Sequence, residues 1–145
     1  CYLNIPDTSG RDSLFQAEAR RCKEILTNID ENKNKNHFCI FDELYSGTNP
    51  YEATASSYSF LKYLSSNSNV TFLLTTHFVD LCEKLDKHKK IFNCHMETNE
   101  VNNELQYKYK LTKGISKIRG GVEVLKKLDY PENMIKETLD YLHKL

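Results

Sequence analysis

Two short, mainly apolar runs constrain the fold of this chain more than any other feature of its sequence. Residues 38–41 form the first run, which is followed directly by the adjacent carboxylates Asp42 and Glu43, and residues 70–74 form the second. Apolar runs without alternation are typical of strands covered on both faces, as in a parallel sheet. A helical pattern over residues 51–64 supplies the crossover that two parallel strands need. We therefore predict an α/β fold with a parallel sheet flanked by helices.

The spacing of apolar residues predicts the remaining elements. They are a helix over residues 13–29, a further short helix after residue 77, an edge hairpin of residues 91–95 and 105–111, and two helices beyond Gly114. Asp12 or Ser13 is expected to cap the first helix, because short polar side chains satisfy the free amides there.

Charge and cysteine usage limit the setting and the class of function. The 145 residues carry 20 Lys and Arg against 20 Asp and Glu, a balance that argues against a module dedicated to coating nucleic acid. The five cysteines show no CxxC spacing, so we expect buried thiols in a reducing compartment. A secretory signal and a membrane-spanning run are both absent from the sequence. Because the chain begins at Cys1 rather than Met, we expect it to be part of a longer protein.

Asp42 and Glu43 are the strongest candidates for chemistry. They follow a predicted parallel strand, and ligands of open α/β sheets bind at the carboxyl ends of the strands. Phosphoryl transfer uses such a pair, with one carboxylate holding Mg²⁺ and the other orienting or deprotonating water. His77 follows the next strand and is expected at the same edge. An ordinary acidic turn and a structural histidine are the alternative interpretations.

Several motifs occur in an order that resembles the ATPase domain of the MutS mismatch-repair proteins, which are ABC-class P-loop ATPases. Residues 9–18 resemble the family's signature stretch, with its S-x-F-x-x-E core at Ser13, Phe15 and Glu18, and residues 38–43 resemble its Walker B strand. The other matching stretches are Gly47-Thr48-Asn49-Pro50-Tyr51-Glu52 at the D-loop turn, Thr76-His77-Phe78 at the histidine switch, residues 111–121 before the terminal helices, and Pro131-Glu132-Asn133-Met134-Ile135 at a helix start. Residues 42–53 in particular resemble MutS-like proteins of large DNA viruses and their relatives.

The resemblance implies a P-loop fold and a role for each matching residue. Asp42 would hold Mg²⁺ through water, Glu43 would be the hydrolytic base, and His77 would be the γ-phosphate switch. Ser13 would reach the γ-phosphate bound by a second subunit, so that a dimer has two composite ATP sites. Gly47 and Thr48 would transmit changes between these two ATP sites. ATP and Mg²⁺ are the implied cofactors.

The resemblance also implies a domain division, partners and a location. Residues 1–113 would be a partial ATPase core, and residues 114–145 a helical dimerisation segment. The full protein would couple ATP binding and hydrolysis to recognition of mismatched duplex DNA by domains outside this chain. It would be intracellular, in the nucleus, the cytoplasm or a viral factory, and neither secreted nor bound to a membrane.

The sequence departs from the family pattern in ways that bear on activity. Leu14, Ala19 and the pair Asn49-Pro50 replace residues that are usual in the family's signature and D-loop. More importantly, no G-x-x-x-x-G-K-[ST] loop for cradling phosphates occurs in the 145 residues. We therefore expect the isolated chain to bind ATP poorly and not to hydrolyse it.

Other interpretations of the chain remain open. Without a phosphate cradle it could be a non-catalytic dimerisation or interaction module derived from an ABC-class ATPase. A structural-maintenance ATPase is disfavoured, because those proteins carry an L-S-G-G signature. A zinc site is disfavoured by the spacing of the residues between 77 and 95. The tyrosines and lysines of residues 107–110 could form a nucleic-acid strip, although an alternating edge strand explains them more simply.

Overall fold

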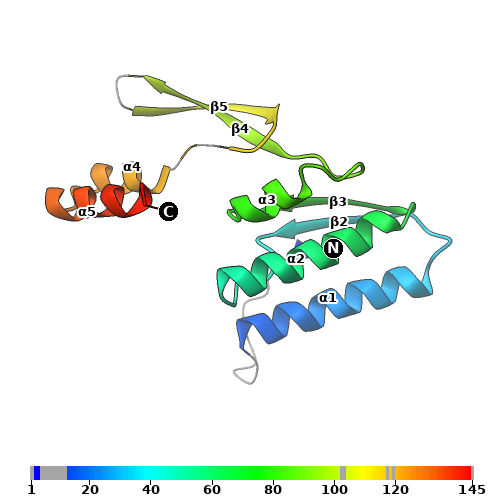
Figure 1. Ribbon diagram of the computed structural model, residues 1–145. Coiled ribbons are helices and arrows are strands. Elements are labelled where there is room, and N and C mark those ends of the chain that lie inside the picture. The colour runs from blue at the N-terminus through cyan, green and yellow to red at the C-terminus, as the bar shows by residue number, and fades with distance from the viewer. Residues whose placement is uncertain (1, 4–12, 102–103, 117, 119, 145) are drawn as a thin grey trace. The chain divides into compact units, whose positions relative to one another are not determined.

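The computed structural model describes residues 2–3, 13–101, 104–116, 118 and 120–144. The chain divides into two compact units, Cys1–Asn93 and Cys94–Leu145. The first unit contains a parallel sheet and three helices, and the second contains an antiparallel hairpin and two helices (Figure 1). The predicted mixed α/β class with a parallel sheet is confirmed.

The sheet of the first unit has the order β1-β2-β3, and all its strands are parallel. Strand β1 (Tyr2–Leu3) pairs with β2 (His37–Asp42), which pairs with β3 (Val70–Thr75) in a register that places Asp42 opposite Thr75. Strands β2 and β3 lie where the apolar runs predict them, whereas β1 was not predicted. This register brings the polar ends of β2 and β3 to one edge of the sheet.

Three helices form the core of the first unit. Helix α1 (Leu14–Glu31) lies between β1 and β2 in sequence, α2 (Pro50–Ser66) lies between β2 and β3, and α3 (Val79–Leu85) follows β3. Their apolar side chains pack with Cys39 and Phe41 of β2 in a single buried cluster. The rings of Phe41 and Phe60 meet edge to face with centroids 5.5 Å apart, a favoured arrangement for aromatic pairs.

The prediction that the strands are covered on both faces is wrong for the described residues. Burial alternates along β2 and β3, and the side chains of Phe38, Ile40 and Leu73 are 55%, 41% and 59% exposed. Successive side chains of a strand point to opposite faces, and the three helices contribute to one core against Cys39 and Phe41. Helices therefore cover one face of this sheet, and the opposite face carries exposed apolar side chains.

The second unit combines a hairpin with a pair of helices. Strands β4 (Cys94–Val101) and β5 (Glu104–Lys113) are antiparallel, and α4 (Gly120–Lys127) and α5 (Glu132–Leu142) follow. The predicted helix pair is confirmed. The predicted hairpin is present, but its first strand is Cys94–Val101 rather than residues 91–95, so most of the expected polar turn is part of this strand. The alternation of β5 produces no buried face: Tyr107, Tyr109 and Leu111 are 57%, 85% and 67% exposed. The pairing register shifts between Met96 and Thr98, and Tyr109 adopts a positive φ of 53°.

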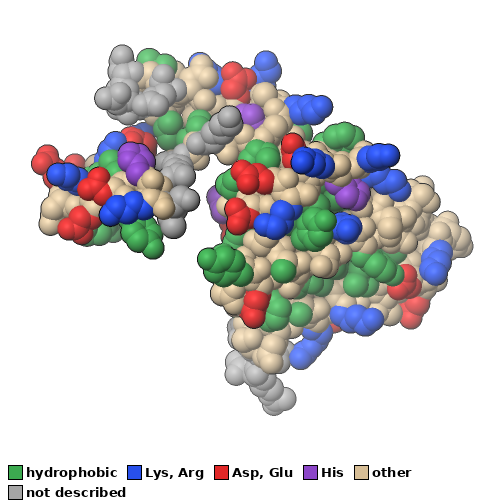
Figure 2. All heavy atoms as spheres, in the orientation of Figure 1, with side chains coloured by type: hydrophobic (Ala, Val, Ile, Leu, Met, Phe, Trp, Pro, Cys, Tyr) green, Lys and Arg blue, Asp and Glu red, His purple; other side chains and the backbone are tan. Residues whose placement is uncertain are grey.

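The hairpin thus belongs to the same compact unit as the terminal helices. The functional division at residues 113 and 114 stays a prediction. On the face shown in Figure 2, basic and acidic side chains are interspersed. Within the described ranges, no helix is both long and apolar enough to cross a bilayer.

Candidate functional site

The end of β2 places Asp42 at the edge of the sheet where β3 also ends. Asp42 is exposed and lies on the same strand face as Phe38 and Ile40, away from the helical core. Its Oδ1 accepts a hydrogen bond from the Thr75 hydroxyl, the residue opposite it in the register. The carboxylate is therefore oriented by β3 and remains accessible to a ligand above this face.

Glu43 and His77 meet beside Asp42. The Glu43 amide donates to the Thr75 carbonyl at 3.0 Å, and Glu43 then turns out of the strand with a positive φ of 51°. His77 Nε2 lies 3.1 Å from Glu43 Oε1, and the two side chains are 90% and 49% exposed. The structure thus brings together the three polar residues that the sequence places at the ends of adjacent strands.

The side chains at this edge fit a Mg²⁺ ion that is bound to the protein through one carboxylate. Mg²⁺ prefers oxygen ligands and usually keeps several waters, bound through one or two carboxylates together with substrate phosphates. Asp42 offers one accessible carboxylate, and its neighbour Thr75 offers a hydroxyl oxygen. Within the described residues, no group of three or more His, Cys, Asp or Glu side chains could hold a metal by itself. The remaining ligands would have to be water and phosphate.

Ser13 lies at the N-terminus of α1 and caps it. Its hydroxyl accepts from the Gln16 amide at 3.3 Å, and its own amide donates to the Gln16 side-chain oxygen at 2.9 Å. This reciprocal capping box satisfies the backbone amides of Ser13 and Gln16 within the chain. Of the two expected capping residues, Ser13 caps the helix and its hydroxyl is engaged within the chain, whereas Asp12 lies outside the described residues.

Gly47 lies directly against the first turn of α1. A Cβ atom at Gly47 would be 2.5 Å from the Phe15 nitrogen and 2.9 Å from Leu14 Cβ, so only glycine fits this approach. Thr48 follows it and donates its hydroxyl to Glu52 at 2.8 Å. The structure therefore groups Gly47 and Thr48 with the start of α1.

The predicted site residues thus form two groups. Asp42, Glu43 and His77 make up the first, and Ser13, Gly47 and Thr48 make up the second. Among the described residues, no hydrogen bond or ion pair joins a member of one group to a member of the other. The segment 43–48 connects them along the chain.

Asn49 and Pro50 depart from the family's D-loop pattern, and the local structure explains why these residues are suited to their positions. The Asn49 side chain accepts from the Glu52 amide at 3.0 Å and caps α2, and Pro50 occupies the first position of that helix. Asparagine is among the strongest N-caps, and proline is favoured at the next position. These residues start the helix and leave Gly47 and Thr48 in place.

Glu18 belongs to the S-x-F-x-x-E pattern, but the sequence assigned it no role. It is 5% exposed and accepts hydrogen bonds from Ser46 and Gly47. A signal for it is present in the sequence, because Glu18 falls in the stripe of apolar residues on α1 between Phe15 and Cys22. A carboxylate in an apolar stripe must find hydrogen-bond donors inside the fold.

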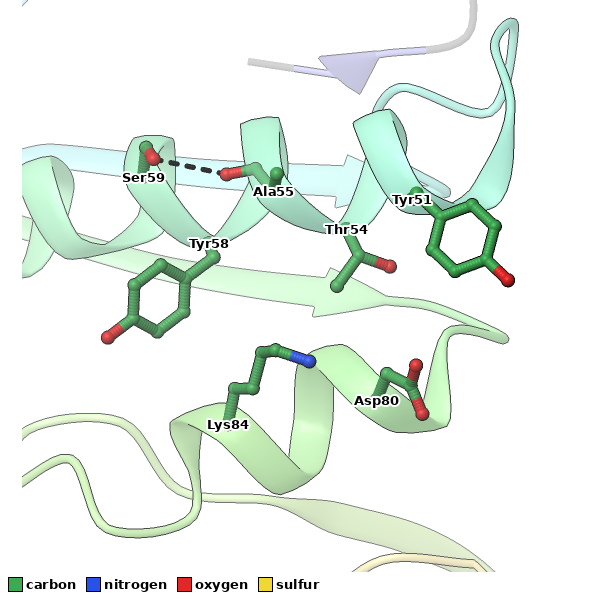
Figure 3. A pocket seen from close by; sticks show the side chains of 7 residues that line it. All are labelled: Tyr51, Thr54, Ala55, Tyr58, Ser59, Asp80 and Lys84. Atoms are coloured by element: carbon green, nitrogen blue, oxygen red, sulfur yellow. Dashed lines mark hydrogen bonds between the residues drawn. The ribbon is translucent and has the colours of Figure 1, made fainter.

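A separate cavity of about 640 Å³ lies between α2 and α3 (Figure 3). Tyrosine rings from α2 and the charged side chains of Asp80 and Lys84 from α3 face it. None of the predicted site residues lines this cavity. The hollow is therefore distinct from the edge of the sheet where the polar residues meet.

Comparison with known proteins agrees with the motif order. Residues 6–145 match the family described as MutS domain V. The chain is 33% identical over 120 residues to the DNA mismatch repair protein MutS of Aquifex pyrophilus, covering 83% of this chain and 14% of that protein. It is 27% identical over 139 residues to MutS of Acholeplasma laidlawii, covering 96% of this chain and 16% of that protein.

MutS of Finegoldia magna is similar at 25% identity over 136 residues, which is 92% of this chain and 16% of that protein. The chain therefore spans only a small part, 14–16%, of the length of these curated relatives. Because the family match extends from residue 6 to residue 145 and includes every motif from Ser13 onward, this chain belongs to the MutS domain V family.

Proposed function

We propose that this chain supplies the Walker B, switch and signature elements of a MutS-type ATPase that couples ATP binding and hydrolysis to recognition of mismatched DNA. The observation that carries the proposal is the meeting of Glu43 and His77, 3.1 Å apart, beside the exposed carboxylate of Asp42. A carboxylate base, an imidazole and a metal-binding carboxylate at the end of a parallel sheet are among the protein groups that serve phosphoryl transfer.

Each group has a defined task in this proposal. Mg²⁺, when bound near Asp42, neutralises phosphate charge. Glu43 takes a proton from the attacking water, and His77, which contacts Glu43, can exchange that contact for one to the γ-phosphate. Ser13 belongs to the second group of residues. In a dimer, Ser13 of one subunit contacts the γ-phosphate that is bound by the other subunit. A loop that cradles the phosphates must come from sequence outside these 145 residues.

The same proposal includes the assembly and its location. The helical segment 114–145 supports a dimer with composite ATP sites, and DNA is contacted through other domains. The reducing intracellular setting follows from the family and from the thiols, since Cys22 and Cys39 are buried and free. The alternative is a non-catalytic interaction module, which the absence of a phosphate-binding loop in the sequence favours.

A chimera separates these two functions. The chain replaces the corresponding segment of Aquifex pyrophilus MutS, to which it is 33% identical, and steady-state ATP hydrolysis is measured with Mg²⁺. We expect hydrolysis by the chimera and a fall in kcat of about 10²-fold or more in Glu43→Ala, with nucleotide binding retained. Glu83→Ala, at an exposed position of α3, is the matched control and should leave kcat unchanged.

Unchanged turnover in Glu43→Ala would show that Glu43 is not the base. A folded chimera that binds nucleotide and hydrolyses none would favour the interaction module. The isolated 145-residue chain should show no ATPase activity in the same assay, and turnover that depends on Glu43 would overturn this expectation.

A further inference from the structure

Glu18 connects the start of α1 to the loop that follows Glu43. Its Oε1 accepts from the amide and the hydroxyl of Ser46, at 3.3 and 3.2 Å, and its Oε2 accepts from the Gly47 amide at 3.1 Å. With 5% exposure, the carboxylate is removed from water, and hydrogen bonds to a charged group are stronger than those between neutral groups. Both oxygens of Glu18 are therefore committed to two consecutive loop residues.

The loop and α1 are also in direct steric contact at this point. Gly47 approaches so closely that a Cβ there would be 2.5 Å from the Phe15 nitrogen. The ring centroids of Phe15 in α1 and Tyr45 in the loop lie 5.7 Å apart. A displacement of the loop is therefore resisted by packing. Glu18 adds hydrogen bonds to Ser46 and Gly47, beside the side-chain hydrogen bond between Cys22 of α1 and Tyr45 of the loop.

The other end of the loop holds Glu43. Between Glu43 and Ser46 the backbone is folded tightly, because Glu43 and Tyr45 both have positive φ values, 51° and 58°. The Leu44 carbonyl accepts from the buried Ser57 hydroxyl at 3.2 Å, which fixes the middle of the loop to α2. A loop this short and this constrained passes a shift at Gly47 to Glu43.

We infer that Glu18 is a positioning residue that holds the start of α1, with Ser13, and the loop bearing Glu43 as one rigid block. This role rests on the proposed function for its catalytic meaning, since Ser13 and Glu43 belong to different halves of the composite site. Fixing their separation within one subunit sets the spacing between the two ATP sites of the dimer. Glu18 itself touches neither nucleotide nor water in this assignment.

Amide hydrogen exchange of the isolated chain tests the geometric part. In Glu18→Gln one acceptor oxygen is lost and an N–H group faces the loop amides, so we expect exchange at Ser46 and Gly47 to become about tenfold faster or more. Exchange at Glu43, whose amide donates to β3, should change less than in the loop. Glu24→Gln, on the exposed face of the same helix, is the matched control.

Exchange at Ser46 and Gly47 that is unchanged in Glu18→Gln would overturn the inference. If that variant does not fold, Ser46→Ala removes only the hydroxyl donor of an exposed residue and gives the same test. Faster exchange at Gly47 than in wild type then supports the inference, and unchanged exchange contradicts it.

The ATPase chimera tests the catalytic part. We expect Glu18→Gln to lower kcat about tenfold while the KM for ATP stays within about twofold, because catalysis depends on alignment more steeply than nucleotide binding does. A purely structural role would change the melting temperature without lowering kcat selectively relative to the KM for ATP. Wild-type kcat in a variant with a loosened loop would refute the positioning role. An inactive wild-type chimera would count against the proposed function alone. The hydrogen-exchange experiment would still decide whether Glu18 holds the loop against α1.

Discussion

Replacing Gly47 with alanine probes the close approach between α1 and the loop after β2. The added Cβ would lie 2.5 Å from the Phe15 nitrogen and 2.9 Å from Leu14 Cβ and Cγ. Since the first of these is a backbone atom in a capped helix turn, it cannot rotate away, and the helix or the loop must move. Overpacking of this kind costs about 2 kcal/mol.

For a unit the size of Cys1–Asn93, a loss of that size corresponds to a fall in melting temperature of roughly 8–16 °C. Thermal unfolding followed by circular dichroism measures it. Gly121→Ala is the matched control, because nothing lies within 4 Å of a Cβ there and alanine favours the helix. A Gly47→Ala variant that melts within about 2 °C of the wild type would refute the steric argument.

Two further predictions concern α2 and the buried thiols. Asn49→Ala removes the cap of α2 and should lower the free energy of unfolding by about 1 kcal/mol in a urea titration. The control Asn34→Ala, in an exposed turn, should change the free energy of unfolding by less than about 0.5 kcal/mol. Equal effects of the two variants would contradict the capping role. Burial raises the pKa of the Cys22 thiol from 9.0 to about 11. The unfolded chain therefore releases this proton first as the pH rises, and the free energy of unfolding should fall between about pH 9 and pH 11. Cys22→Ala should show a shallower fall, and an equally steep one would contradict this assignment.

Local sequence patterns predicted the elements of the first unit well. The apolar run at residues 70–74 corresponds to β3, Val70–Thr75, and the periodic stretch at residues 13–29 corresponds to α1, Leu14–Glu31. The exposed face of the sheet could not be predicted in this way. An apolar run shows that side chains on both faces are apolar, but which face is covered depends on where the helices pack.

The candidate site was predictable where it depends on topology. Parallel neighbouring strands end at the same edge, so the meeting of Glu43 and His77 follows from their positions after two strands. The contacts of Glu18 with Ser46 and Gly47 were not predictable from spacing, because they join residues that are 28 and 29 positions apart. Only the three-dimensional path of the loop brings them together.

In the proposed mechanism Ser13 and Glu43 act in different halves of a composite ATP site, and a subunit-mixing experiment tests this arrangement. Chimeras carrying Ser13→Ala and Glu43→Ala are each inactive in this account. When equal amounts are mixed and the dimers exchange subunits, about half of the dimers are mixed, and each of these has one intact site. The mixture should therefore recover about a quarter of the wild-type ATPase rate, whereas a mixture that stays as inactive as the separate variants would contradict the account.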